Sequence, residues 1–398
     1  MRPGHVPVPR YRPYSGAALF ARSYRPFFLG AAIWAVLALA LWLGTLTVGL
    51  VLPTRFDPVA WHAREMLFGF VGAAACGYLL TSTPNWTGRM PLNGAPLAGL
   101  AALWLLGRVA IATSDHLGEL TAAIADLLLW LVLIAAILRE IVAGRSWRNI
   151  PPTAALAGLA AANAASHAAL LGWIEDAALG WRAGIGVVVA LLGLVGGRVV
   201  PSFTRNWLAK RRDKRFPLTD RRLDAAVHAA SLTGLVLWVA DVWLPLAAAA
   251  LLLAGLLHAV RLLRWNGWLT LRAPIVWVLH VGYGWIPVGI ILLGLSILMP
   301  ATVPHAAALH ALTAGAMGTM ILGVMTRVAL AQDQRGTEAG PLTTAMFLFV
   351  AAAAALRVIA AFVPQAYLPL LIASGGAWIA GFALFALVHG RWMVRAPQ

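Results

Sequence analysis

The stretch Trp61-His-Ala-Arg-Glu-Met-Leu-Phe-Gly-Phe70 opens one of many long apolar segments in this chain. It places a histidine, an arginine and a glutamate within about one turn of the start of that segment. Ionisable groups are costly inside a membrane, and those that are present mark functional sites by default. A second stretch, Pro304-His-Ala-Ala-Ala-Leu-His310, opens a later segment in the same way. The two stretches predict a pair of membrane helices that face each other and hold a metal cofactor.

The composition predicts an all-α, polytopic membrane protein. Of the 398 residues, 61% are hydrophobic and only 11% are charged, whereas a soluble domain carries about 25% charged residues. A membrane helix needs about 20 apolar residues. We interpret twelve segments as such helices: 27–52, 60–82, 95–113, 117–138, 152–172, 181–200, 223–243, 245–263, 273–299, 304–330, 341–362 and 366–389.

The distribution of charge predicts the orientation of the chain. Lys and Arg gather at both ends of the chain and in the even-numbered connections, while the odd-numbered connections carry acids: Asp57, Asp115, Glu119, Glu175, Asp176 and Asp241. Because cytoplasmic loops are enriched in Lys and Arg, both termini are expected to be cytoplasmic. This division gives an N-terminal segment 1–26, a membrane domain 27–389 with a basic loop near 201–222, and a tail 390–398. The net charge of +16 follows from these loops and indicates contact with lipid rather than with nucleic acid.

The sequence also contains a weak internal repeat. A Thr lies near an Arg at the expected cytoplasmic ends of helices two, six and ten, each time after a glycine-rich helix. The spacing of four helices favours three four-helix units. A chance match explains the Thr and Arg positions equally well, and the glycines more safely indicate close packing between helices.

The expected topology sorts the histidines by depth. One level, in the outer half of the membrane, holds His62, His167, His305 and His310; a second, on the cytoplasmic side, holds His228, His258 and His280. Neutral imidazole is the commonest metal ligand, and histidine is a usual axial ligand of haem. For any single histidine, the alternative is a packed side chain bonded to a carbonyl or hydroxyl group.

Other side chains at the outer level favour haem or copper. Arg64 and Arg357 could each face a haem propionate, because an intramembrane arginine needs an anionic partner; an ion pair with Glu65 or Asp126 is the alternative for Arg64. Met66 and Met317 follow His62 and His310 on the same helix faces. Their thioether sulfur atoms would suit Cu(I), although methionine at such positions is more often a packing residue.

At these residues the chain resembles the NnrS family of bacterial membrane proteins. The resemblance spans nearly the whole chain. It rests on Arg25-Pro-Phe-Phe28, Trp61–Phe70, Pro84-Asn-Trp-Thr-Gly-Arg89, Gly196-Gly-Arg-Val-Val-Pro-Ser-Phe-Thr-Arg-Asn206, Leu279-His-Val-Gly-Tyr-Gly-Trp285 and His310-Ala-Leu-Thr-Ala-Gly-Ala-Met-Gly318. It implies twelve helices in a bacterial inner membrane, b-type haem, copper and a role in the nitric-oxide response. Two family histidines are replaced here, by Arg64 and within Ala331-Gln-Asp-Gln-Arg335, so no role of theirs carries over.

A second likeness is to haem–copper oxidases and nitric-oxide reductases, which hold a low-spin haem between histidines of helices two and ten. His62 and His310 lie on the corresponding helices, and this is analogy at the level of the fold. The chain lacks the paired histidines on one helix that the oxidase copper site requires.

These observations lead to one hypothesis, one rival from another class, and a third alternative, a sensor or assembly factor whose haem is regulatory. The hypothesis is a haem- and copper-binding protein that binds or processes nitric oxide and protects against nitrosative stress. His62 and His310 would be haem ligands with His167 and His305 nearby, while His228, His258 and His280 would form a second site for copper or another haem. If the protein is an enzyme, it is an oxidoreductase that consumes nitric oxide with electrons from a quinol or a partner protein. The rival is a transporter or chaperone of haem, copper or another small solute.

Overall fold

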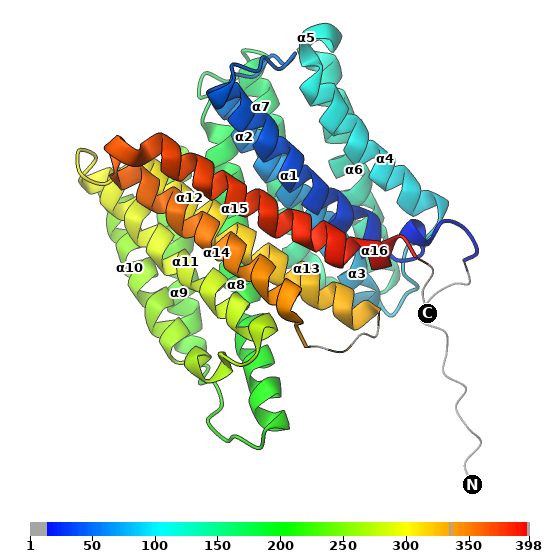
Figure 1. The fold of residues 1–398 in the computed structure, drawn as a ribbon, viewed down its shortest axis with the longest axis vertical. Coiled ribbons are helices and arrows are strands. Elements are labelled where there is room, and N and C mark those ends of the chain that lie inside the picture. The colour runs from blue at the N-terminus through cyan, green and yellow to red at the C-terminus, as the bar shows by residue number, and fades with distance from the viewer. Residues whose placement is uncertain (1–13, 334–335, 337, 396–398) are drawn as a thin grey trace.

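The computed structural model describes residues 14–333, 336 and 338–395, and the regular structure in them is entirely helical (Figure 1). Arg2, Arg10 and Arg12 of the expected basic N-terminal segment, and Arg335, lie outside the described residues. The long helices are α1 (Tyr24–Thr47), α2–η2–α3 (Pro58–Arg64, Glu65–Val71 and Gly72–Thr87), α4 (Ala95–Ala112), α6 (Glu119–Ala143), α7 (Ile150–Leu170), α8 (Leu179–Lys210), α9 (Arg221–Ala240), α10 (Leu244–Leu263), α11 (Pro274–Leu298), α12–η5–α13 (His305–His310, Ala311–Gly318 and Thr319–Gln332), α14 (Pro341–Phe362) and α15 (Tyr367–Val388). Short helical turns connect them: η1 (Ala18–Phe20), α5 (Ser114–Leu117), η3 (Trp147–Asn149), η4 (Gly267–Thr270), η6 (Pro364–Ala366) and α16 (Gly390–Met393).

Within the described residues, eleven helices are long and apolar enough to cross a membrane. The all-α membrane fold is therefore confirmed. The remaining long helix is α7, which coincides with the expected segment 152–172 but is not among these eleven. It has no Asp, Glu, Lys or Arg, yet it carries Asn163 and His167 between its alanines. The exact number of spans, the side on which the termini lie, and the three four-helix units stay predictions.

Two helical ends differ from the expected domain limits. Helix α8 continues through Pro201 to Lys210, so the first half of the expected basic loop is helical. The loop that remains ends at Asp220, whose carboxylate accepts hydrogen bonds from the backbone N–H groups of Arg222 and Leu223 and so caps α9. These backbone donors lower the pKa of Asp220. The expected tail begins with α16.

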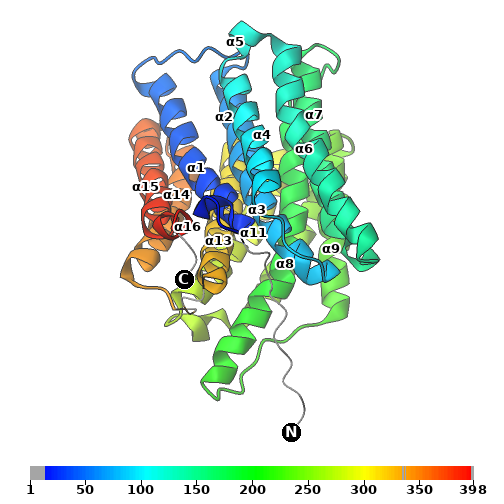
Figure 2. The same ribbon diagram turned by 90° about the vertical axis from the view of Figure 1, so that its right-hand side faces the viewer.

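The helices that carry the two histidine stretches are the innermost of the bundle. In their most apolar windows, 72% of the residues of α2–η2–α3 and 67% of those of α12–η5–α13 are buried, against at most 50% in each of the other spanning helices. The first and last long helices, α1 and α15, pack side by side (Figure 1). Figure 2 shows α5 at one end of the bundle and the C-terminal part of α8 at the other. The connection that holds Asp115 and the basic end of α8 therefore lie at opposite ends of the bundle.

A buried arginine joins the two ends of the described chain. Arg25 is 1% exposed and pairs with Asp333, after α13, at 2.8 Å. The same guanidinium group donates to the carbonyl oxygens of Ala18, Met393 and Arg395. Arg25 thus ties η1, α13 and α16 to the start of α1.

Candidate functional site

A cavity of about 420 Å³ lies between the two innermost helices. Its volume falls within the range of small-molecule and cofactor pockets, about 300–1,000 Å³. Most of the lining is apolar and comes from α1, α2, η2, α8, η5 and α15. Five of the side chains expected to bind haem or copper line it together: His62, Met66, His310, Met317 and Arg357.

Each of the two histidines is followed closely by a π-helical segment. His62 precedes η2 by three residues, and His310 directly precedes η5. Single π turns within α-helices are rare and occur often at functional sites. Along Pro58–Val71, His62, Met66 and Phe70 line the cavity at intervals of four residues, so they lie along one side of the helix. Glu65 lies between them in the sequence and contacts Trp34 and Arg108 instead.

The polar atoms at the cavity include several with no partner. His310 donates from Nδ1 to the carbonyl oxygen of Ala306 at 2.8 Å, which leaves Nε2 as the nitrogen available to a ligand or metal. His62 stacks on Trp42 with ring centroids 4.2 Å apart, and its buried Nδ1 has no hydrogen-bond partner. Arg357 is 7% exposed, and its Nε and Nη1 have no partner either. Its guanidinium group lies 5.7 Å from the ring centroid of Tyr367, and no carboxylate among the described residues pairs with it. A buried cation of this kind that lines a cavity fits the propionate groups of a haem.

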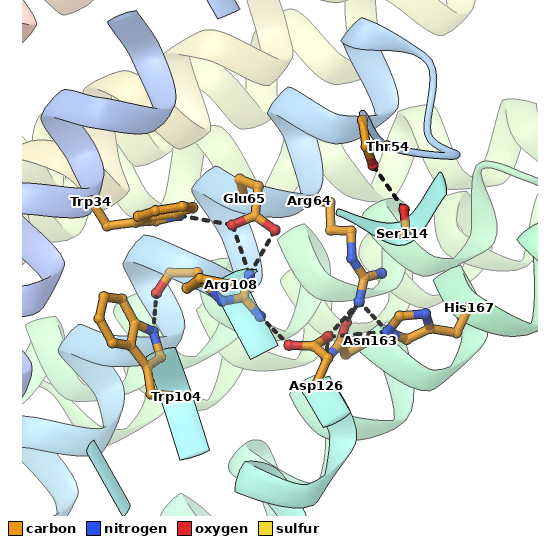
Figure 3. Close-up of polar contacts among 11 residues, drawn as sticks. Trp34, Thr54, Arg64, Glu65, Trp104, Arg108, Ser114, Asp126, Asn163 and His167 are labelled. Atoms are coloured by element: carbon orange, nitrogen blue, oxygen red, sulfur yellow. Dashed lines mark hydrogen bonds and ion pairs between the residues drawn. The ribbon is translucent and has the colours of Figure 1, made fainter. Parts of the chain in front are cut away.

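Two of the other residues expected at this level, Arg64 and His167, lie in a buried ionic network behind α2 (Figure 3). Arg64 donates to Asp126 and to Asn163, the latter at 2.7 Å, and contacts His167 Nε2. Asn163 also donates to Asp126 at 2.8 Å. Residues two apart on a helix point about 200° from each other, so Arg64 faces away from the side on which His62 lies.

Arg108 completes this network. Its guanidinium group pairs with both carboxylate oxygens of Glu65, at 2.7 and 2.8 Å, and with Asp126. Trp34 donates to Glu65 at 2.8 Å. All four charged side chains are at most 2% exposed, and two arginines balance two acids. The sequence reasoning missed Arg108, although an arginine inside the apolar segment 95–113 was the signal that could have identified it.

His305 lies apart from both groups. It begins α12, accepts or donates a hydrogen bond at 3.1 Å with Ser296, and packs near Trp238 with ring centroids 6.1 Å apart. It does not contribute to the cavity lining described above.

The three histidines of the cytoplasmic level are engaged separately. Tyr283 donates to His258 Nδ1 at 2.8 Å, and His258 Nε2 donates to Ser231 at 3.1 Å. His280 bonds to Thr204 at 2.8 Å, and His228 bonds to the Asp224 carbonyl oxygen at 2.5 Å. Throughout the part of the chain that the structure describes, no three His, Cys, Asp or Glu side chains are grouped to hold a metal ion.

The fold and the cavity together define a multi-pass, all-helical membrane protein with a histidine-lined pocket between its two innermost helices. The family described as NnrS protein matches residues 18–396. The chain therefore belongs to the NnrS family, and the resemblance seen in the sequence is confirmed. A comparison with curated proteins finds no match.

Proposed function

We propose that the protein binds haem and copper in the bacterial inner membrane and uses them to bind or process nitric oxide. One observation carries the proposal: His62, His310 and Arg357, whose Nε and Nη1 have no hydrogen-bond partner, line a single cavity between the two innermost helices. Membership of a family that is generally associated with haem and copper supports the same cofactors.

The residues around the cavity suit each part of a haem. His62 and His310 would be the iron ligands, and Arg357 would pair with a propionate group. Trp42 and the other apolar side chains would pack against the macrocycle and exclude water. When bound, the haem would supply a redox-active iron at which nitric oxide can bind.

Copper has softer donors at the same cavity. Met66 and Met317 present thioether sulfur atoms, which favour Cu(I). His228, His258 and His280 remain the second candidate set, but His258 already has a partner at each ring nitrogen. We therefore favour the cavity methionines for copper.

Spectroscopy of purified protein tests this proposal. We expect a haem Soret band and a matching EPR signal that are lost in both His62→Ala and His310→Ala. His305→Ala is the matched control, because His305 belongs to the same level but lies outside the cavity lining. A band that persists in both cavity variants would move the haem elsewhere, and haem-free protein from well-supplied cells would favour the transporter. Nitric-oxide turnover by the purified protein then distinguishes an enzyme from a sensor or chaperone.

A further inference from the structure

A second pocket, of about 380 Å³, lies at the opposite end of helix two from the stretch Trp61–Phe70. It is formed where α3 ends, α4 begins and α6 approaches its end. These are the ends of three candidate membrane spans, Pro58–Thr87, Ala95–Ala112 and Glu119–Ala143. The pocket therefore lies at the depth of lipid headgroups. It includes most of the motif Pro84–Arg89, to which the proposed function gives no role.

The polar wall of this pocket carries excess positive charge. Arg89 and Arg139 both pair with Glu140, the latter at 2.8 Å. Two guanidinium groups against one carboxylate leave one net positive charge. The side chains of Arg89 and Arg139 are 47% and 69% exposed, while that of Glu140 is 19% exposed. The arginines are thus open to a ligand, whereas the carboxylate is already occupied.

Much of the remaining lining is apolar. It includes Leu80, Pro84, Met90, Ala136 and Ile137. A pocket with a cationic rim and an apolar wall suits an amphipathic anion. Basic pockets between helices on the cytoplasmic side of membranes bind anionic lipid headgroups.

We propose that this pocket binds one anionic phospholipid, with its phosphate between Arg89 and Arg139 and its glycerol region against Leu80 and Ile137. A zwitterionic lipid fits less well, because its ammonium group would need a free carboxylate and Glu140 is already paired with Arg89 and Arg139. The site is independent of the cofactor cavity.

Native mass spectrometry of the full-length protein, delipidated and then given defined lipids, tests the site. We expect phosphatidylglycerol to be retained at least tenfold better than phosphatidylethanolamine. Arg89→Gln/Arg139→Gln should remove this preference, whereas Arg211→Gln, in an exposed basic position near the end of α8, should keep it. Equal retention by the double variant would overturn the proposal.

Two further measurements guard against a variant that simply misfolds and against a plain phosphate site. Glu140→Gln removes the negative charge and frees both arginines, so phosphatidylglycerol retention should rise at least threefold. If Arg89, Arg139 and Glu140 only stabilise the fold, phosphatidylglycerol retention should be unchanged or weaker instead. Inorganic phosphate in the low millimolar range should not displace the lipid. Displacement of the lipid in that range would mean that the pocket binds free phosphate and would refute the lipid assignment.

Discussion

Replacing Asp126 by Asn should destabilise the protein strongly, because this carboxylate is the point at which the buried network converges. Asp126 accepts from Arg64, Arg108 and Asn163 and contacts His167. The substitution keeps the shape of the side chain but leaves two buried arginines with Glu65 as their only acid in the network. One positive charge is then uncompensated in a place that is at most 2% exposed.

The size of the effect follows from the charges. Two unit charges about 4 Å apart attract by about 4 kcal/mol at an effective dielectric constant of about 20. Desolvation offsets part of this attraction, and removal of one partner from a buried pair costs about 3–5 kcal/mol. That loss corresponds to roughly two to nearly four orders of magnitude in the unfolding equilibrium constant. Reversible unfolding of the purified protein in mixed micelles, followed by circular dichroism, measures it.

The double variant Asp126→Asn/Arg64→Gln makes the reasoning refutable. It leaves Arg108 and Glu65 paired at 2.7 Å and removes the uncompensated charge. Its loss of stability should therefore be smaller than the sum of the two single losses, by about 0.5–3 kcal/mol. Asp115→Asn, in a half-exposed pair with Arg55, is the control and should change little. A loss below about 1 kcal/mol for Asp126→Asn, or additive losses in the double variant, would contradict the account.

Three further substitutions test other contacts. Arg25→Ala should cost about 3–5 kcal/mol, because it leaves Asp333, whose side chain is only 9% exposed, without its ion-pair partner. It should also speed hydrogen exchange in α16; unchanged exchange there would contradict the role of Arg25 in holding α16 to α1. Tyr283→Phe removes the donor to His258 and an acceptor of Arg261, and should cost about 1–3 kcal/mol in the same unfolding assay; a neutral result would mean that water replaces the hydroxyl group. Gly234→Ala places a Cβ 2.9 Å from the Leu251 backbone nitrogen and should cost about 1–3 kcal/mol, whereas Gly376→Ala meets nothing within 4 Å and should be neutral or stabilising; equal effects of the two would contradict close packing of α9 on α10.

Much of the fold was predictable. Each helix in a membrane satisfies its own backbone hydrogen bonds, so a membrane helix can be recognised in the sequence from the length of its apolar segment. The expected segment 341–362 coincides with α14, and segment 245–263 starts one residue after the start of α10. The end of α8 was not predictable in this way. Its last turns are polar and extend beyond the apolar stretch, so hydropathy stops near residue 200 while the helix continues to Lys210.

The candidate site was predictable in depth but not in direction. Topology places His62, His167 and His310 at one level, and the structure brings His62 and His310 to the same cavity. It places His167 against Asp126 instead, because depth says nothing about which side of a helix bundle a residue faces. The π turns after His62 and His310 were equally invisible, since the sequence pattern alone cannot distinguish an i→i+5 turn from an α-helical one.

One short stretch, His62 to Met66 in α2 and η2, contributes side chains to both the cavity and the ionic network, which lie on different sides of the helix. His62 and Met66 line the cavity, while Arg64 and Glu65 join the ionic network. Because the four residues share little more than one turn, a change that loosens the network should also move His62. Among the described residues, no comparable ionic network supports α12 behind His310, whose hydrogen bond is to the backbone carbonyl oxygen of Ala306 in the same helix. If haem binds as proposed, Asp126→Asn should therefore alter the spectroscopic signature of the His62 ligand and leave that of His310 unchanged. Equal perturbation of both ligands, or of neither, would contradict this coupling and would mean that the network stabilises the fold without setting the position of His62.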